Sequence, residues 1–386
     1  MTSIRPTRAE ISRAALRENV AVLRRAAPGA ALWPMVKANA YGHGMVPVAV
    51  ELASAGVDGL GVATVEEGLA LREEAALHAT PIVVFGADYG SAHAAVLGAR
   101  LVPVVHRAAD VAAFARAGAD MGTTAPVSVE AEIDTGMARL GFRHDRAAEL
   151  LDALRAAPNV RLAGLFTHFA ASEDPKEDAF TKLQLERFEA VVAAARAAGH
   201  APRIHAANSG GIFRHAAAHY DAVRPGIATY GVAPSDSVRA PLVPALRLVS
   251  AVSTVRDLAA DDSVGYDRTF VASAPMRVAS VPIGYGDGLH RTLSNRGAVL
   301  VAAWRCPVVG RVSMDSIVVD VTGAGDVGPG AEAVLIGAQG DAAIRAEDVA
   351  AWSGTNTYEV FTSLSARVSR VMVEAHAGYR SPAKSR

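Results

Sequence analysis

The chain has 386 residues, with 38 lysines and arginines against 39 aspartates and glutamates and a single cysteine, and this length allows one large barrel with a smaller second domain. The balanced charge argues against a nucleic-acid partner, and the longest runs without a charged residue are too short to cross a membrane. The lone Cys306 excludes an intramolecular disulfide and a cysteine-built metal site, and the charged N-terminus lacks the apolar core of a secretory signal, so we expect a cytoplasmic enzyme.

The first 230 residues alternate short apolar runs with alanine-rich stretches of helical period. The apolar runs, which we interpret as strands, are 31–36, 59–63, 81–85, 101–105, 126–133, 161–166, 203–206 and 222–224. The helical stretches include 14–26, 65–75, 111–117, 145–156 and 176–198, and Asp145 and Asp174 are placed to cap the last two. About eight β-then-α units predict an α/β fold, a (β/α)8 barrel. Alternation alone does not distinguish a barrel from an open, doubly wound sheet, which stays as the alternative.

After Gly231 the chain becomes richer in proline and in short β-like segments. The segments interpreted as strands are 246–255, 277–283, 298–303, 316–321 and 333–336, whereas only 345–352 and 358–364 have a helical pattern. We therefore expect residues 1–240 to form the barrel and residues 241–386 to form a mostly β C-terminal domain, which residues 1–10 can join.

Lys37 directly follows the first apolar run. In a barrel the active site forms where the strands end, so this position is one where chemistry is expected. Burial lowers the pKa of a lysine there and makes its amine available as a nucleophile or base, although a lysine that only reaches solvent or a carboxylate is the simpler alternative. The glycine turn that follows, Tyr41-Gly42-His43-Gly44, carries a phenol and an imidazole and favours a loop that wraps a ligand.

Two glycine-containing loops follow the seventh and eighth runs, at Ser209-Gly210-Gly211 and at Arg224-Pro225-Gly226. Barrels commonly bind a phosphate between these two loops, and the Ser209 hydroxyl and glycine N–H groups suit that role. Turns use glycine in any case, so either loop alone is weak evidence. A lysine at a strand end together with a phosphate pocket suggests pyridoxal 5'-phosphate attached to Lys37.

A series of longer motifs runs from residue 34 to residue 360: PMVKANAYGHG, IDTGMARLGF, THFAASED, HAANSG, VRPGIATYG, VGYDRTF, IGYGDG, GRVSMDSIVVDV and TNTYEV. In this order they resemble the signatures of the alanine racemase family. The lysine motif alone also resembles related barrel enzymes that use pyridoxal phosphate, but the complete set is much more specific. The resemblance implies a cofactor-binding barrel followed by a β domain.

The resemblance also implies a cofactor site, with Lys37 carrying the pyridoxal phosphate and Arg224 facing the pyridine nitrogen. The residues that it assigns to the cofactor are Lys37, Tyr41, His168, Asn208, Ser209, Arg224, Gly226, Ile227 and Tyr358. Because arginine keeps its proton, the ring nitrogen facing it should stay unprotonated. An unprotonated ring is a poorer electron sink, which disfavours transamination.

Racemisation needs a base on each face of the α-carbon. The resemblance makes Lys37 one base and Tyr266 the other, with His168 as the partner of Tyr266 and Arg224 behind it. A phenol with an ordinary pKa near 10 is a poor base at neutral pH, so a neighbouring positive charge or imidazole must assist it. Taken alone, His168 would be interpreted as an ordinary histidine at a strand end.

Tyr266 lies in the expected β domain, and in the family this domain reaches the neighbouring subunit's active site. The resemblance therefore implies a homodimer with shared active sites. Met314 and Tyr285 match residues contributed in the same way, to the substrate carboxylate region and to the entrance. Without the resemblance, Met314 would be interpreted as a core residue.

Three positions depart from the family pattern. Glu132 stands where many members have a carboxylated lysine, whose negative charge orients the arginine matching Arg139 near the substrate carboxylate. Our hypothesis is that Glu132 partly replaces that group, and the alternative is a glutamate that points elsewhere. Asp267 replaces a common glycine after Tyr266, and Ser313 replaces a common cysteine.

The leading functional prediction is racemisation of a small amino acid, alanine first, to supply D-alanine for peptidoglycan precursors. Serine or a broader range of amino acids is the nearest variant. Decarboxylation of a basic amino acid is a rival reaction, but that family pairs the pyridine nitrogen with a carboxylate, unlike Arg224. A non-catalytic pyridoxal phosphate carrier is a further rival, and such proteins lack the second domain and Tyr266.

Overall fold

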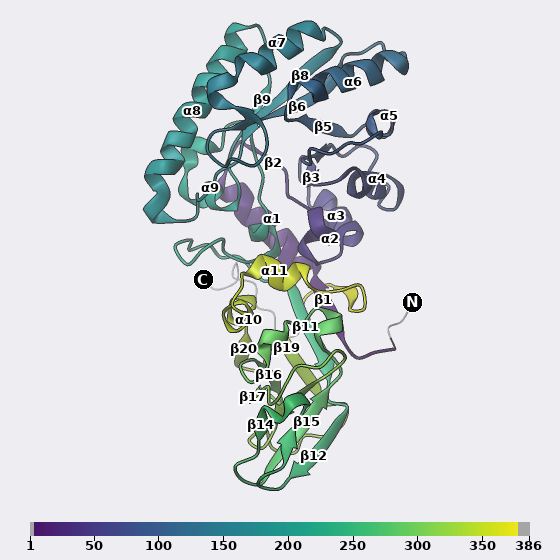
Figure 1. Cartoon of the computed structure of the whole chain (residues 1–386), viewed down its shortest axis with the longest axis vertical. Coiled ribbons are helices and arrows are strands. Elements are labelled where there is room, and N and C mark those ends of the chain that lie inside the picture. Colours follow the sequence, from purple (N-terminus) through teal and green to yellow (C-terminus); the bar gives the residue numbers. More distant parts are fainter. Residues whose placement is uncertain (1–3, 377–386) are drawn as a thin grey trace. The chain divides into compact units, whose positions relative to one another are not determined.

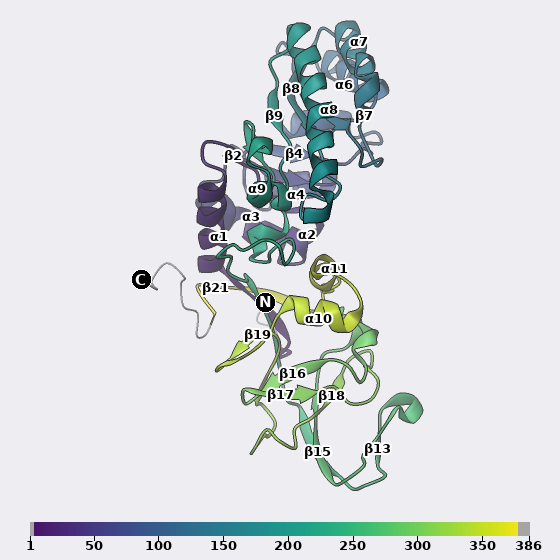
Figure 2. The ribbon, with the colours of Figure 1, turned by 90° about the vertical axis from the view of Figure 1, so that its left-hand side faces the viewer.

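The structure is a computed structural model that describes residues 4–376, arranged in two compact units. The barrel unit comprises Leu16–Ala40 and Met45–Val243, and the β unit comprises the described residues among 4–15, 41–44 and 244–376. Figures 1 and 2 show the barrel unit in purple to teal and most of the β unit in green to yellow. Within residues 4–376, no helix is both long enough and apolar enough to cross a bilayer.

A closed sheet of parallel strands forms the centre of the barrel unit. Its strands are β2 (Ala31–Leu32), β3 (Leu60–Val62), β4 (Ile82–Val84), β5 (Val102–Val105), β6 (Val127–Asp134), β8 (Val160–Thr167), β9 (Arg203–His205) and β10 (Ala222–Val223). They neighbour one another in chain order, and β7 (Phe142–Arg143) pairs with β6 outside this order. Hydrogen bonds from Val36 N to Gly61 O (2.8 Å) and from Gly61 N to Pro34 O (2.9 Å) join the end of β2 to β3. The sheet thus closes on itself, which confirms the predicted barrel over the open sheet.

Helices lie around the outside of these strands (Figure 1). They are α1 (Arg13–Ala26), α3 (Met45–Ser54), α4 (Val65–Glu73), α5 (His93–Gly98), α6 (Ala108–Asp120), α7 (Ala148–Ala156), α8 (Asp178–Ala197) and α9 (Ser209–Arg214). Strand β10 is followed by a 3₁₀ turn, Ile227–Tyr230, instead of an α-helix. The Asn19 side chain of α1 donates to the carbonyls of Thr229 (3.2 Å) and Val243 (2.8 Å), so α1 packs beside the segment after β10.

One of the two predicted helix caps is wrong. Asp174 accepts a hydrogen bond from Lys176 N and caps the 3₁₀ turn that leads into α8. Asp145 instead accepts from the Arg143 guanidinium at 2.7 and 3.0 Å, and α7 begins only at Ala148. The charged guanidinium two residues earlier competes for the carboxylate, and its hydrogen bonds lower the pKa of Asp145 to about 2.

The β unit is built on a sheet that includes the N-terminal segment. Its strand order is β17-β16-β19-β11-β1-β21, with β20 also paired to β19. These strands are β1 (Arg8–Ser12), β11 (Leu246–Ala251), β16 (Ala298–Val301), β17 (Trp304–Pro307), β19 (Glu332–Gln339), β20 (Ala342–Ile344) and β21 (Ser369–Val373). Strand β1 pairs antiparallel with β11 and parallel with β21, so the first strand of the chain belongs to the sheet of the later domain.

Two smaller sheets and two helices complete the β unit. The sheets are β12-β15-β18, from β12 (Thr254–Leu258), β15 (Met276–Val281) and β18 (Ile317–Asp320), and the hairpin of β13 (Ser263–Val264) with β14 (Phe270–Val271). The helices are α10 (Ala346–Ser353) and α11 (Thr357–Thr362). The Asn356 side chain accepts from Glu359 N and caps α11, which supports the predicted helix there.

Candidate active site

Four basic side chains leave strands of the barrel unit at the same end of the sheet. They are Lys37 after β2, Arg139 after β6, His168 after β8 and Arg224 after β10. Burial is the main cause that lowers the pKa of His168, to about 3, and the charges of Arg224, Arg139 and Lys37 lower it further. The structure therefore brings these four predicted residues together, and it keeps His168 neutral across the physiological range.

The amine of Lys37 is prepared for chemistry by its surroundings. Burial lowers its pKa, the charge of Arg139 adds to this effect, and the carboxylate of Glu67 opposes it. A lower pKa leaves more of the amine uncharged at neutral pH, and the uncharged amine is the nucleophile and the base. This environment differs from the solvent-exposed lysine that sequence alone left open.

The backbone after Lys37 forms a left-handed turn, α2 (Lys37–Tyr41). Residues 38–41 have φ between +51° and +55°, a region that residues with a Cβ disfavour. The turn is held by two side chains: Glu67 accepts from Ala38 N (2.7 Å), and Asn39 accepts from Met45 N (2.8 Å). The loop after the lysine is thus a fixed, strained structure, which is typical of functional sites.

Arg224 is fully enclosed and fixed by neighbours. Its terminal nitrogens bond to His205 Nδ1 (2.7 Å) and to the carbonyls of Thr167 (2.8 Å) and Ala206 (3.2 Å), and its guanidinium lies 4.8 Å from the ring centre of Phe166. Its Nε makes no hydrogen bond to any described residue. Burial lowers the pKa of Arg224 to about 10, against the opposing charges of Glu132 and Glu130, so it stays charged at neutral pH.

A buried carboxylate lies behind the imidazole that supports Arg224. Glu130 Oε2 is 3.1 Å from His205 Nε2, and both side chains are buried. Gly164 of β8 faces Glu130 across the sheet, and a Cβ there would lie 2.5 Å from Glu130 Oε1. The absence of a side chain at Gly164 gives Glu130 the room to reach His205.

The position of Glu132 favours the alternative of a glutamate that points away from Arg139. Its carboxylate lies 3.2 Å from His106 Nδ1, with both side chains buried, and no ion pair between Glu132 and Arg139 is found among residues 4–376. Alternate residues of a strand point to the same side, so Glu132 and Glu130 both extend toward the barrel interior. The carboxylate of Glu132 thus lies inside the barrel near His106, while Arg139 is exposed.

The loops after β9 and β10 converge at one hydroxyl. Ser209 Oγ accepts hydrogen bonds from Gly226 N (2.9 Å) and Ala228 N (3.3 Å), next to the buried Ile227. Asn208 accepts from Gly211 N (3.0 Å) and from Ser172 Oγ (2.7 Å), so its side chain caps α9. A hydroxyl and several backbone N–H groups gathered in this way suit an anion such as a phosphate.

The other predicted residues lie in the β unit. The rings of Tyr41 and Tyr358 have centres 5.9 Å apart, and burial raises the pKa of Tyr41, which therefore stays a neutral phenol. Tyr285 and Met314 lie on adjoining loops and are 43% and 51% exposed. Tyr266 is 68% exposed, so its phenol is accessible on the surface of the chain.

Asp267 replaces a common glycine of the family, and its backbone conformation explains why glycine is common at this position. Its φ is +59°, in the left-handed region, and its carboxylate lies 3.5 Å from Arg311 Nε. Aspartate tolerates this conformation better than most residues other than glycine and asparagine. The substitution therefore keeps the turn after Tyr266.

The structure adds site residues that the motifs did not single out. They are Glu67, Glu130, His106 and His205, which support the loop after Lys37 or the charges around Arg224. A signal for the glutamates was present, because an apolar strand with Glu130 and Glu132 two residues apart directs both carboxylates to one face. Of their partners, His205 ends β9 and is the first residue of the motif HAANSG, whereas His106 follows β5 and belongs to none of the motifs.

Comparison with known proteins gives matches over both units. A family model described as "Alanine racemase, N-terminal domain" matches residues 11–234, and one described as "Alanine racemase, C-terminal domain" matches residues 245–372. An alanine racemase of Symbiobacterium thermophilum is 41% identical over 373 residues, which cover 96% of this chain and 98% of that protein. The solved structure of the alanine racemase of Streptomyces coelicolor A3(2) has a TM-score of 0.89 at 37% identity, covering 95% of this chain and 98% of the other. The structure from Bartonella henselae, described with covalently bound pyridoxal phosphate, has a TM-score of 0.86 at 29% identity, with coverage of 95% and 99%.

Proposed function

The chain belongs to the alanine racemase family, and from this premise we propose that it interconverts L-alanine and D-alanine with Lys37 and Tyr266 as the two bases. The family consists of isomerases that depend on pyridoxal 5'-phosphate, so this chain is an enzyme of that class. The observation that carries the proposal is the setting of Lys37: its pKa is lowered by burial and by Arg139, at a strand end of the barrel.

The residues of the barrel unit fit pyridoxal phosphate. The amine of Lys37 suits the aldehyde, and Ser209 with the N–H groups of Gly226 and Ala228 suits the phosphate. The Arg224 Nε, which has no partner among the described residues, suits the pyridine nitrogen. We assign a further phosphate contact to Ile227, and we assign to Asn208 the fixing of the Ser209 loop. The phosphate contacts of Tyr41 and Tyr358 rest on the resemblance to the family alone.

The bound cofactor would withdraw electrons from the α-carbon of the substrate and so acidify its proton. Lys37 would hold that proton on its amine at one face, and the phenol of Tyr266 of the partner subunit would supply one at the other. Neutral His168 can hydrogen-bond to that phenol and stabilise the phenolate when it forms. Arg224 keeps its own proton and leaves the pyridine nitrogen without one.

Two groups suit the carboxylate of the substrate. The guanidinium of Arg139 is exposed beside Lys37, and we assign it to the carboxylate in the same subunit. The backbone N–H of Met314 has no hydrogen-bond partner in the described part of the chain, and we assign it to the same carboxylate from the partner subunit, with Tyr285 at the entrance. These roles require a homodimer with shared active sites.

The physiological part of the proposal is supply of D-alanine for peptidoglycan in the cytoplasm. The single cysteine, Cys306, is buried and free, which is compatible with a reducing compartment. Serine is the nearest alternative substrate, since it differs from alanine by one hydroxyl group.

The direct test is incubation of the purified protein and pyridoxal phosphate with L-alanine, followed by chiral separation of the products. We expect equilibration of the two enantiomers, and loss of it in Lys37→Ala. No D-product from alanine, serine or other small amino acids would refute the racemase function. Full activity of Lys37→Ala would refute the assigned mechanism while leaving the reaction intact.

A further inference from the structure

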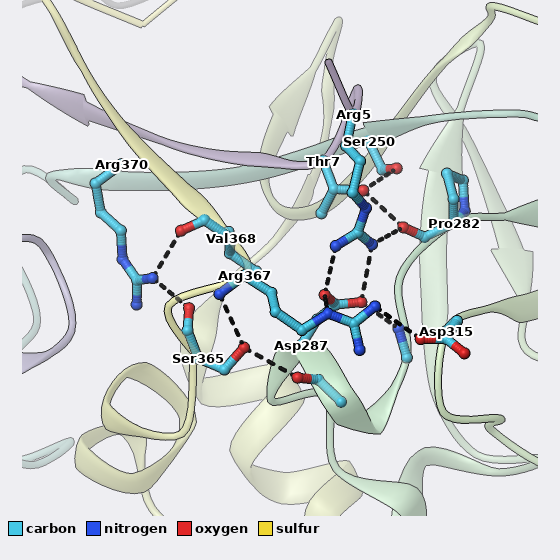
Figure 3. A network of polar contacts seen from close by, with 12 residues as sticks. Arg5, Thr7, Ser250, Pro282, Asp287, Asp315, Ser365, Arg367, Val368 and Arg370 are labelled. Atoms are coloured by element: carbon cyan, nitrogen blue, oxygen red, sulfur yellow. Dashed lines mark hydrogen bonds and ion pairs between the residues drawn. The ribbon is translucent and has the colours of Figure 1, made fainter. Parts of the chain in front are cut away.

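We propose that Asp287 and Arg5 form a clamp that positions the two loops carrying Tyr285 and Met314, so that the N-terminal segment sets substrate binding. This inference rests on the proposed function for the roles of Tyr285 and Met314. Arg5 and Asp287 are positioning residues, because they act through the two loops. Figure 3 shows the network from close by.

Asp287 is the centre of the network and is fully buried. Its carboxylate accepts two hydrogen bonds from the Arg5 guanidinium, at 2.7 and 3.0 Å, and one from Gly284 N at 3.0 Å. The second Arg5 nitrogen also donates to Pro282 O at 2.8 Å. Burial would raise the pKa of Asp287, but the hydrogen bonds from Arg5 and Gly284 and the charge of Arg367 lower it, so the carboxylate is ionised at neutral pH.

The residues around Asp287 join the two loops through the backbone. Tyr285 N donates to Ser313 O (3.0 Å), and Gly286 N donates to Met314 O (2.8 Å). A Cβ at Gly284 would overlap the carbonyl oxygens of Ser313 and Met314, so glycine is needed for this close approach. The positions of Tyr285 and Met314 are therefore coupled to each other.

A second arginine connects the same carboxylate to the other loop. Arg367 Nε lies 3.4 Å from Asp287 Oδ1, and Arg367 Nη2 lies 2.7 Å from Asp315 Oδ1, next to Met314. Ser365 Oγ donates to Gly286 O at 3.0 Å, which adds a further link (Figure 3). Asp287 thus forms ion pairs with Arg5 of the N-terminal segment and with Arg367, and it connects the loops that carry Tyr285 and Met314.

The bidentate contact between Arg5 and Asp287 is the one to remove in a test of the clamp. Charge-assisted bidentate hydrogen bonds fix geometry more strongly than single bonds. The Arg5 side chain is one-third exposed and lies in the N-terminal segment outside β1, so its loss leaves the sheet intact. Because Asp287 is completely enclosed, its replacement threatens the fold, and the test uses Arg5 instead.

The test compares Arg5→Ala with Arg8→Ala in the full-length holoenzyme. Arg8 lies three residues further on, at the start of β1, and its side chain pairs with Glu10, away from Asp287, so it is a nearby arginine that serves as the control. In Arg5→Ala we expect hydrogen–deuterium exchange in peptides spanning residues 283–288 and 312–316 to rise about tenfold. We expect the KM for L-alanine to rise about fivefold with kcat within about twofold, because binding of the substrate is affected more than the proton transfer. Arg5→Lys, which keeps the charge without the bidentate geometry, should lie between the two.

Arg8→Ala should leave both exchange and KM as in the unaltered enzyme. A lowered melting temperature in Arg5→Ala with unchanged exchange in both peptides would overturn the clamp, and so would faster exchange with an unchanged KM. Equal effects of Arg5→Ala and Arg8→Ala would overturn it as well. The exchange measurement needs no activity, so a protein that failed to racemise any amino acid would refute the proposed function and still allow the contact between the loops to be tested.

Discussion

The proton positions around Arg224 follow from the side chains that hold it. Arginine only donates, so His205 Nδ1 must accept the 2.7 Å bond and the ring proton must sit on Nε2. That proton points to Glu130, 3.1 Å away. Burial lowers the pKa of His205, against the opposing effect of Glu130, so the imidazole is neutral. The hydrogen-bonded series Arg224–His205–Glu130 thus consists of a charged guanidinium, a neutral imidazole and a carboxylate.

Removing Glu130 should destabilise the protein. We expect Glu130→Ala to lower the free energy of unfolding by about 3 kcal/mol, because it leaves the buried N–H of His205 without an acceptor and leaves Arg224 with Glu132 as its remaining countercharge. Glu130→Gln keeps an acceptor oxygen and should lose less than about 1.5 kcal/mol. Urea unfolding of both variants measures the difference, and equal losses would contradict the assigned proton.

His168 gives a prediction about acid stability. Its pKa in the folded protein is about 3, against an ordinary 6.5. Between these two pH values the unfolded chain binds a proton that the folded chain does not, so the free energy of unfolding falls as the pH drops. We expect His168→Asn to reduce that slope by up to about 1.4 kcal/mol per pH unit between pH 6.5 and 4.5. Urea unfolding at several pH values checks this, and parallel curves for the two proteins would refute it.

At the scale of elements, the start of α4 and the loop after Lys37 depend on the same side chain. Glu67 accepts from Ala63 N (2.8 Å) and Thr64 N (3.2 Å) in the capping box of α4, and from Ala38 N (2.7 Å) in the left-handed turn. One carboxylate therefore fixes the ends of two neighbouring barrel segments.

We expect Glu67→Ala to loosen the cofactor site. Without the carboxylate, Ala38 N loses its acceptor and the disfavoured left-handed turn loses a support, so the apparent Kd for pyridoxal phosphate should rise about tenfold. Titration of the apoprotein, followed by absorbance of the cofactor, measures it. Glu66→Ala is the matched control, because Glu66 is an exposed acid in the same first turn. Similar constants for the two variants would contradict the proposal.

The sequence predicted the elements whose signal is local. All eight barrel strands were expected within a few residues of where they lie, since each is a short apolar run after a helical stretch. The short helix α5 was not among the named helical stretches, and the strands β1 and β21 were not expected. Strand β1 forms because β11 and β21 lie on either side of it, and those partners are more than 230 residues away in the chain. Such pairing leaves little trace in a five-residue segment.

The geometry of the site was less predictable than its residue types. The motifs indicated Lys37, but nothing in KANAY distinguishes a left-handed turn from an ordinary loop. The sequence also left the surroundings of Glu132 open, because whether it lies near His106 or Arg139 depends on how adjacent strands direct their side chains. The local sequence identifies the residue types of the site, but which side chains contact one another depends on how the folded sheet orients them.

For the whole molecule, the division of the site residues between two units has a consequence for assembly. Lys37, Arg139, His168 and Arg224 lie in the barrel unit, whereas Tyr266, Tyr285 and Met314 lie in the β unit. In the proposed homodimer each barrel unit would receive the second group from its neighbour. The proposal therefore makes catalysis a property of the pair, and the N-terminal clamp of one subunit would act on its neighbour's substrate.

Mixing two inactive variants tests the shared sites. In a mixed dimer of Lys37→Ala and Tyr266→Phe, one site would lack both bases and the other would hold an intact Lys37 with an intact Tyr266 of the partner subunit. Random reassortment makes half of the dimers mixed, each with one working site, so activity should return to about one quarter of the unaltered enzyme. The two variants are unfolded together, refolded with pyridoxal phosphate and assayed by chiral separation, with each variant refolded alone as the control. If both bases came from one chain, no refolded dimer would contain a complete site and the mixture would stay as inactive as its components.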